Sequence, residues 1–167
     1  MSGTFQITIA REQDVAQILT FIQELAVYER EPDAVVATHD DLRNALFGPA
    51  PKVFAVLCWE DDTPVGFALY FFNFSTWLGQ HGIYLEDLYV TPSFRGRGAG
   101  KLLLQHLAGI AVAEGCGRFE WSVLNWNKPA IDFYESVGAR PQSEWMVYRL
   151  TGQALEDLAL PNTPVHR

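Results

Sequence analysis

Residues 82–101 constrain the fold of this chain more than any other stretch. Residues 82–90 are rich in β-branched and aromatic side chains, and Pro92 follows them, which is typical of a strand and its end. The glycine loop, residues 95–101 with the sequence RGRGAGK, comes next, and an apolar helical run begins at Leu102. A strand, a glycine-rich turn and a helix start in this order offer backbone N–H groups and the positive end of a helix dipole to an anion. The stretch therefore predicts a site for a phosphate-bearing ligand.

Two features of the glycine loop narrow this interpretation. The cationic side chains of Arg95, Arg97 and Lys101 gather in a chain that is otherwise acidic. The glycine spacing is neither that of a P-loop nor the GxGxxG of a dinucleotide-binding turn. The alternative is a structural turn at a helix start, in which glycine only supplies positive φ. The flanking strand, the following helix and the cations favour the anion site over this alternative.

The apolar pattern along the rest of the chain predicts one mixed α/β domain over residues 1–167, with a loose tail at about 161–167. Strands are expected at residues 5–10, 53–59, 65–74, 83–90, 118–123 and 145–150. Helices are expected at residues 14–29, 38–48, 102–114, 127–137 and 153–158, with Thr38 as a cap. The total expected is about six to seven strands and about four to five helices.

Composition and charge argue against several classes of protein. The formal net charge of −8 disfavours nucleic-acid binding, because phosphate contacts need a basic face. The sequence contains no recognisable signal peptide or membrane span, so we expect a cytoplasmic protein without a membrane partner. Cys58 and Cys116 lack metal-ligand spacing and suit a reducing cytoplasm. The four histidines are scattered along the chain, so no metal site is expected.

A second motif, residues 124–139, combines a helix start with two polar side chains. Asn127 occupies the expected N-cap, and Pro129 lies near the helix start, where proline is favoured. Tyr134 follows Asn127 by seven residues. Seven steps of about 100° return to nearly the same helix face, about 10 Å along the axis, so one extended ligand can touch both side chains. The alternative is a structural cap and a half-buried tyrosine.

These two motifs, in this order, resemble those of the GNAT N-acetyltransferase superfamily. The glycine loop resembles the pattern Gln/Arg-x-x-Gly-x-Gly/Ala that holds the acetyl-CoA pyrophosphate, and residues 127–138 resemble Asn-x-x-Ala-x-x-Phe-Tyr-x-x-x-Gly. The resemblance implies a single-domain GNAT-like fold of the α+β type with a mixed, mostly antiparallel sheet, and acetyl-CoA as cosubstrate without a metal. The implied cofactor-binding residues are Leu88, Tyr89, Val90, Arg95, Gly96, Arg97, Gly98, Ala99, Gly100, Lys101, Asn127, Pro129, Ala130 and Tyr134.

The residue types suit acetyl transfer from a thioester to an amine. That reaction needs a neutral amine, a polarised carbonyl and a proton for the sulfur. The phenol of Tyr134, which the resemblance implies as general acid, is a neutral donor at pH 7, and a backbone N–H near Leu88 can polarise the carbonyl. Neither cysteine lies in the site motifs, so we expect direct transfer in a ternary complex without an acetyl-enzyme.

Glu86 and Asp87 are the candidates for accepting the amine proton. They interrupt the otherwise apolar strand IYLEDLYV, where carboxylates are costly unless they are paired or functional. Adjacent strand residues point to opposite faces, so a regular strand lets only one of them line the site, whereas a bulge relaxes this limit. The sequence leaves open which of the two faces the site, and a solvated or capping pair is the structural alternative.

More narrowly, the chain resembles the diamine (spermidine/spermine-type) N-acetyltransferases over almost its whole length. The resemblance rests on ELAxYE at residues 24–29, VGFA at 65–68, YLED at 84–87 and WNxP at 126–129. It implies a homodimer, an amine site lined by Tyr28, Glu29, Trp77 and Glu86 with Asp87 as a further candidate, and Glu86 drawing the amine proton through water. Ser75 stands where polyamine-preferring members carry an acidic residue, as in the branch that acts on thialysine and related amino acids.

The leading interpretation is an acetyl-CoA-dependent N-acetyltransferase of a small primary amine, either a thialysine- or lysine-like amino acid or a di- or polyamine. One alternative is a protein or peptide N-acetyltransferase, which needs a long open groove. The other is a non-catalytic acetyl-CoA-binding sensor. The presence of both Tyr134 and Glu86 argues against the sensor.

Overall fold

The computed structural model describes residues 4–165, and the chain divides into two compact units, Met1–Leu124 and Asn125–Arg167. The strands are β1 (Phe5–Ile9), β2 (Phe54–Glu60), β3 (Thr63–Ser75), β4 (Gln80–Val90) and β5 (Arg118–Trp121). The α-helices are α1 (Val15–Tyr28), α2 (His39–Phe47), α3 (Ala99–Ala113), α4 (Lys128–Ser136) and α5 (Gly152–Leu158). Two short 3-10 helices, η1 (Glu12–Asp14) and η2 (Pro92–Phe94), precede α1 and the glycine loop.

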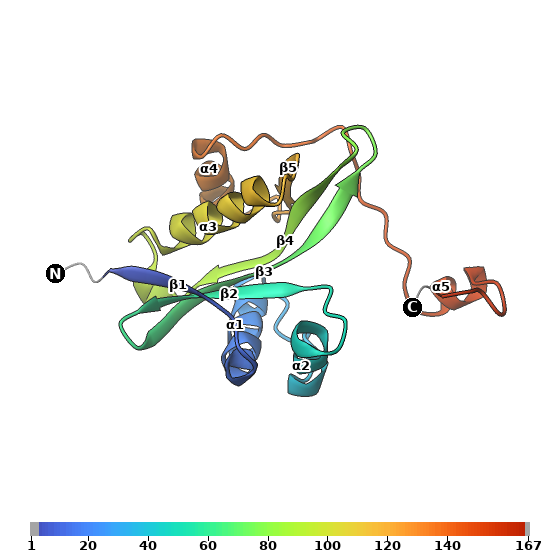
Figure 1. Ribbon diagram of the computed structural model, residues 1–167, viewed down its shortest axis with the longest axis horizontal. Coiled ribbons are helices and arrows are strands. Elements are labelled where there is room, and N and C mark those ends of the chain that lie inside the picture. The colour runs from blue at the N-terminus through green and yellow to red at the C-terminus, as the bar shows by residue number, and fades with distance from the viewer. Residues whose placement is uncertain (1–3, 166–167) are drawn as a thin grey trace. The chain divides into compact units, whose positions relative to one another are not determined.

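The first unit is built on one sheet with the strand order β1-β2-β3-β4-β5 (Figure 1). The strands β1 to β4 form an antiparallel meander, and β5 pairs with β4 in parallel. The predicted mixed, mostly antiparallel sheet and the predicted number of helices are confirmed. The predicted number of strands is wrong, because the sheet has five strands within the described residues rather than six to seven.

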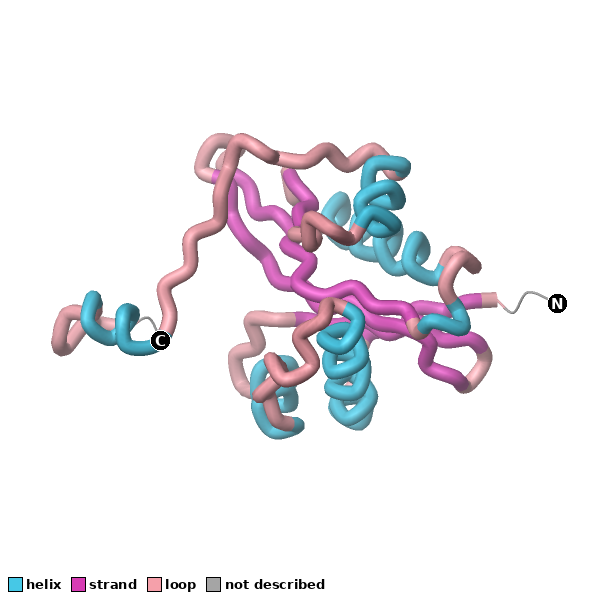
Figure 2. The backbone as a smooth tube through the Cα atoms, turned by 180° about the vertical axis from the view of Figure 1, so that it is seen from behind, coloured by secondary structure: helices cyan, strands magenta, loops and turns pink. Residues whose placement is uncertain are grey.

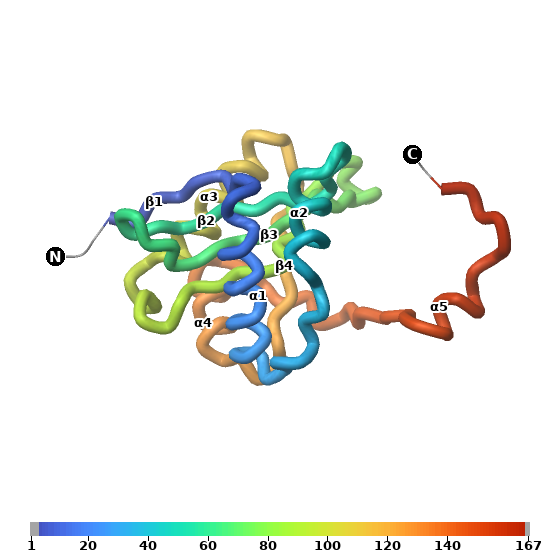
Figure 3. Tube along the Cα trace, turned by 90° about the horizontal axis from the view of Figure 1, so that it is seen from below, coloured from blue at the N-terminus to red at the C-terminus, as the bar shows by residue number. Residues whose placement is uncertain are grey.

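Helices of the first unit cover both faces of the sheet. The helices α1 and α2 lie on one face and α3 on the other (Figures 1 and 3), with the strands as a continuous layer between them (Figure 2). Phe21 of α1 stacks on Phe67 of β3 at 5.7 Å, inside a buried cluster that includes Leu57. Val56, which points to the opposite face because strand side chains alternate, is 1% exposed. A sheet buried on both faces is a rigid support for the loops at its ends.

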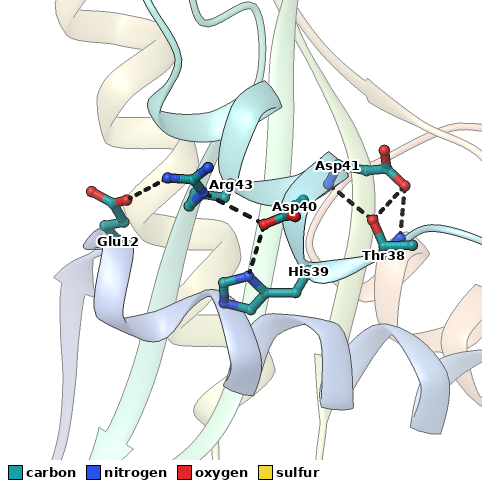
Figure 4. A network of polar contacts seen from close by, with 6 residues as sticks. All are labelled: Glu12, Thr38, His39, Asp40, Asp41 and Arg43. Atoms are coloured by element: carbon teal, nitrogen blue, oxygen red, sulfur yellow. Dashed lines mark hydrogen bonds and ion pairs between the residues drawn. The ribbon is translucent and has the colours of Figure 1, made fainter.

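The helix α2 begins as the sequence predicts. Thr38 Oγ1 accepts a hydrogen bond from the N–H of Asp41 at 3.2 Å, and the Asp41 carboxylate accepts from the N–H of Thr38 at 2.8 Å (Figure 4). This reciprocal pair satisfies N–H groups that a helix start otherwise leaves without partners. Arg43 reaches Glu12 at 3.4 Å in the same view, and this ion pair ties α2 to η1.

The strand predicted at residues 145–150 is wrong. These residues pair with no strand of the described chain, and the side chains of Met146, Val147 and Tyr148 are 75%, 86% and 87% exposed. Aromatic and β-branched residues favour a strand only where a neighbouring strand receives their hydrogen bonds and side chains. The strand predicted at 118–123 also ends early, at Trp121.

Three further expectations concern the tail, membranes and metals. Residues 161–165 are exposed and form no helix or strand, while residues 166–167 of the predicted loose tail lie outside the described residues. Between residues 4 and 165, no helix is both long and apolar enough to span a bilayer. In the same part of the chain, no group of three or more His, Cys, Asp or Glu side chains is arranged to hold a metal ion.

Candidate active site

The glycine loop connects η2 to α3 and takes a conformation that only its glycines adopt readily. Gly96 and Gly98 have φ values of +74° and +96°, a region that residues with a side chain rarely occupy. A Cβ at either glycine would meet nothing within 4 Å, so the backbone conformation rather than crowding requires glycine. Gly98 is the N-cap of α3 and brings no side chain to cap it. The first N–H groups of α3 therefore suit an anion, as predicted.

Two of the three cations in the glycine loop are engaged with the protein. Arg95 Nε donates to the carbonyl of Val90 at 2.8 Å, and its guanidinium lies 4.8 Å from the centroid of the Tyr28 ring. Arg97 forms an ion pair with Glu60 at the end of β2. The predicted positive charge is present, and part of it is balanced within the chain.

A β-bulge interrupts β4 at Glu86. Leu69 of β3 pairs with Asp87 and Tyr70 pairs with Leu85, so Glu86 is an extra residue with no residue opposite it. A bulge breaks the strict alternation of side chains and re-aims them. In a regular strand only one of Glu86 and Asp87 could face the site. The bulge removes this limit. Glu86 is exposed and Asp87 is half-buried.

Glu29, Glu86 and Asp87 form an acidic cluster in the first unit. Burial raises the pKa of Asp87 to about 6, and the negative charges of Glu86 and Glu29 add to the rise. Burial also raises the pKa of Glu29. Since Asp87 experiences the charges of both Glu86 and Glu29, a cation placed near Asp87 is attracted by all three carboxylates. A carboxyl that titrates near neutral pH also suits the uptake of a proton from an amine.

The end of α1 places Tyr28 and Glu29 beside the glycine loop. Glu29 ends the helix, its N–H donating to the carbonyl of Leu25 at 2.8 Å, and Arg30 with φ +66° turns the chain. Tyr28 lies against the guanidinium of Arg95, and α1 also contacts β4. The structure thus places Tyr28, and with it Glu29 of the acidic cluster, beside the glycine loop.

Trp77 lies in the turn between β3 and β4. Ser75 Oγ accepts from the N–H of Leu78 at 3.2 Å, and Gly79 has φ +63°, which together close this turn. Trp77 precedes the first residue of β4, Gln80, which is six residues before the bulge at Glu86. Six residues of a strand span about 20 Å, so the turn and the bulge lie far apart. Within one chain, Trp77 therefore does not join the acidic cluster, and it is 81% exposed. Its role at the amine site rests on the resemblance alone.

The second unit holds Asn127 and Tyr134 in the predicted places on α4. Asn127 Oδ1 accepts from the N–H of Ala130 at 3.4 Å, so the N-cap is confirmed. Pro129 lies in the first turn, as predicted. Tyr134 follows two turns later, with its ring 5.6 Å from that of Phe133. The cofactor and proton-donor roles of these residues stay predictions.

Sequence reasoning missed the surroundings of the glycine loop. Glu60 and Phe5 both contact Arg97, and Glu60 is 37 residues away from it along the chain. Thr91, between β4 and η2, has a buried hydroxyl without a hydrogen-bond partner among the described residues. No spacing in the sequence signals either feature, because both depend on how distant strands pair.

Comparison with known proteins defines the class of enzyme. The sequence profile of the Acetyltransferase (GNAT) family matches residues 14–139. Thialysine N-epsilon-acetyltransferase of Sus scrofa is 39% identical over 161 residues, which cover 90% of this chain and 94% of that protein. L-ornithine N5-acetyltransferase of Arabidopsis thaliana is 33% identical over 196 residues, covering 90% of this chain and 86% of that protein. An integron cassette protein from the mobile metagenome of V. cholerae has a TM-score of 0.78 and 32% identity, covering 95% and 98% of the two chains.

The chain therefore belongs to the GNAT acetyltransferase family. The predicted superfamily, the resemblance to thialysine acetyltransferases and the expected enzyme class, an acyltransferase that transfers acetyl groups, are confirmed. GNAT acetyltransferases use acetyl-CoA, which carries phosphate groups like those of the ligand expected at the glycine loop.

Proposed function

We propose that this chain transfers the acetyl group of acetyl-CoA directly to the primary amine of a small molecule. The observation that carries the proposal is the acidic cluster lying beside the glycine loop in one compact unit. The cluster supports the binding of a cationic amine, and the glycine loop supports the binding of phosphate groups. Residues 82–101 then serve both substrates.

The chain's own groups fit the phosphates and the extended arm of acetyl-CoA. Positive φ at Gly96 and Gly98 turns successive N–H groups toward one side, where the N–H groups of residues 96–101 hold the pyrophosphate. Among the described strands, β5 pairs only with residues 82–85 of β4, so no strand pairs with residues 88–90 on that edge, where the Val90 carbonyl accepts from Arg95 and the Leu88 backbone is left for the arm. The resemblance to the family assigns further cofactor contacts to Asn127, Pro129, Ala130 and Tyr134. When bound, acetyl-CoA supplies a thioester as acetyl donor.

The acidic cluster takes the proton that the amine must lose. An alkylammonium cannot attack a carbonyl until it is deprotonated. Glu86, exposed at the bulge, draws the proton through water, and Asp87, with its pKa raised to about 6 by burial, is a second acceptor at neutral pH. The N–H of Leu88 polarises the acetyl carbonyl while the new N–C bond forms and the C–S bond breaks.

The leaving sulfur receives its proton from the phenol of Tyr134, which is a neutral donor at pH 7. Neither cysteine suits a covalent intermediate. Cys58 is buried in β2, where burial raises its pKa to about 11. Burial also raises the pKa of Cys116, which follows the end of α3. A thiol that stays protonated is a poor nucleophile, which supports direct transfer in a ternary complex.

The proposed amine is a lysine-like amino acid such as thialysine, or a di- or polyamine. An acidic cluster of three carboxylates in a chain with net charge −8 favours cationic substrates. Ser75, the last residue of β3, is buried and adds no charge for a second ammonium group, which favours the lysine-like amine. The names of the thialysine and ornithine relatives support the same choice.

The proposal includes a homodimeric, cytoplasmic enzyme in which residues 1–167 act as one domain. The family match at residues 14–139 extends across both compact units and supports one domain. The exposed apolar side chains at residues 145–150 support an interface with another chain. The free thiols of Cys58 and Cys116 fit a reducing compartment. A metal, nucleic acid or membrane has no part in the proposal.

An amine screen tests this function. The purified chain is incubated with acetyl-CoA and lysine, thialysine, ornithine, putrescine or spermidine in turn, and thiol release is followed together with the mass of the acetylated product. We expect release with the lysine-like amines and one added acetyl group on a primary amine. Activity only on a peptide or protein amine would replace the small-molecule substrate. Acetyl-CoA binding without transfer to any amine would contradict the proposed reaction.

A further inference from the structure

We propose that Arg97 is a positioning residue that anchors the glycine loop to the first two strands of the sheet, and that its side chain is not a phosphate ligand. The inference rests on the proposed function, because it concerns how the loop that binds the cofactor phosphates is held. Glu60, Phe5 and Phe94 then support cofactor binding through Arg97, without contacting the cofactor themselves.

The ion pair between Arg97 and Glu60 is the first support. Both terminal nitrogens of the guanidinium face the carboxylate: one lies 3.4 Å from Glu60 Oε2, and the other hydrogen-bonds Glu60 Oε1. The side chain of Glu60 is 18% exposed and that of Arg97 is 34% exposed. A two-point contact of this kind fixes the plane of the guanidinium as well as its position, and its partial burial protects it from salt.

Two aromatic rings hold the same guanidinium. The centroids of the Phe5 ring in β1 and the Phe94 ring in η2 both lie 5.2 Å from its central carbon. An arginine over a ring face gains a further attraction. If Arg97 swung out to a phosphate, it would leave the half-buried Glu60 carboxylate without its cation and would lose both rings. The observed position is therefore the favoured one in the presence of an anion as well.

The backbone of the glycine loop explains why an anchor is needed. Arg97 lies between Gly96 and Gly98, both of which have positive φ and open space around the position of a Cβ. Glycine has more conformational freedom than any other residue, so neither glycine can hold the turn by side-chain packing. The side chain of Arg97 is the one attachment between them. Fixing it presents the N–H groups of the loop in a ready-made arrangement, which saves ordering entropy on binding.

The ion pair between Arg97 and Glu60 also determines which charges of the glycine loop remain to attract phosphates. Glu60 balances the charge of Arg97, so the attraction between the loop and the phosphates depends chiefly on Arg95, Lys101 and the start of α3. A cation that contacts a phosphate makes binding salt-dependent, whereas an anchor inside the protein does not. Salt dependence therefore separates the two roles of Arg97.

The experiment measures the Kd of CoA by calorimetry at low and high salt for wild type, Glu60→Gln, Arg97→Gln, the double variant and Lys101→Gln. We expect each of the first two variants to raise Kd by about 5- to 10-fold, and the double variant to be no weaker than either, because both remove one interaction. Arg97→Gln should keep the salt dependence of wild type, while Lys101→Gln should reduce it. In steady-state kinetics, Glu60→Gln should raise KM for acetyl-CoA with kcat unchanged.

Two further variants serve as controls for the role of Arg97. Arg97→Lys keeps the charge but loses the two-point contact and the ring contacts, so the anchor predicts weak binding and a phosphate ligand predicts nearly wild-type binding. Arg43→Gln removes another arginine–glutamate pair, with Glu12 at 3.4 Å, and should leave the Kd unchanged. Tighter binding in Glu60→Gln, or a reduced salt dependence in Arg97→Gln, would overturn the inference. A wild-type chain that does not bind CoA would instead overturn the proposed function.

Discussion

Replacing Asp87 by asparagine should stabilise the chain at neutral pH while it impairs catalysis. The pKa of Asp87 is about 6 in the folded chain, against 3.8 for an unperturbed aspartate, because burial and the charges of Glu86 and Glu29 oppose ionisation. At pH 7 the folded state therefore holds a carboxylate where its charge is disfavoured. The pKa difference corresponds to about 3 kcal/mol of unfolding free energy, and an asparagine of the same shape should recover about 1–3 kcal/mol of it.

The sign of this effect depends on pH. Since the folded pKa is the higher one, the folded chain binds more protons than the unfolded chain between about pH 4 and pH 6. The contribution of Asp87 to stability is complete below the unfolded pKa and is lost as pH rises through the folded pKa. In urea unfolding, Asp87→Asn should therefore have a higher free energy of unfolding than wild type at pH 7, and this difference should shrink toward about pH 4.

Asp41→Asn is the matched control, because the pKa of Asp41 is shifted in the opposite direction to that of Asp87. The hydrogen bonds of Asp41 with Thr38 lower the pKa of that carboxyl, so its contribution is present above its unfolded pKa and lost as pH falls. This variant should be less stable than wild type at neutral pH. If Asp87→Asn were also less stable at pH 7, or its effect did not change with pH, the account of the acidic cluster would be wrong.

Three further substitutions test separate parts of the site. Tyr134→Phe should lower kcat by about 100-fold or more while the Kd of CoA stays within about twofold; an unchanged kcat would remove Tyr134 as proton donor. Glu29→Gln should raise the KM of the amine by about 5- to 10-fold, and an unchanged KM for every amine tried would exclude it from the amine site. Gly98→Ala, at φ +96°, should cost about 1–2 kcal/mol of unfolding free energy and weaken CoA binding, whereas Gly109→Ala inside α3, where a Cβ meets nothing within 4 Å, should stabilise the chain.

The sequence predicted those parts of the fold and of the site that depend on near neighbours in the chain. The turn at Gly96 and Gly98, the cap at Asn127 and the capping box at Thr38 are each decided within a few residues, and all three are present. Their physical causes are local: the positive φ of glycine and the hydrogen bonds of a helix start.

The parts that the sequence did not predict depend on which strand pairs with which. The bulge at Glu86 arises from the register of β4 against β3, and the contact between Arg97 and Glu60 needs the end of β2 beside the glycine loop. The strand expected at residues 145–150 has the right propensity, but no strand between residues 4 and 165 pairs with it. In each case the outcome depends on strand pairing, which a pattern of near neighbours in the chain does not specify.

The central claim is that the acidic cluster binds the amine and takes its proton. Its most direct test is kcat/KM of the double variant Glu86→Gln, Asp87→Asn with the best amine from the screen, together with the Kd of CoA in the same preparation. We predict a fall in kcat/KM of at least about 1000-fold with the Kd of CoA within about twofold of wild type. A folded double variant that binds CoA and keeps kcat/KM close to the wild-type value would contradict the claim.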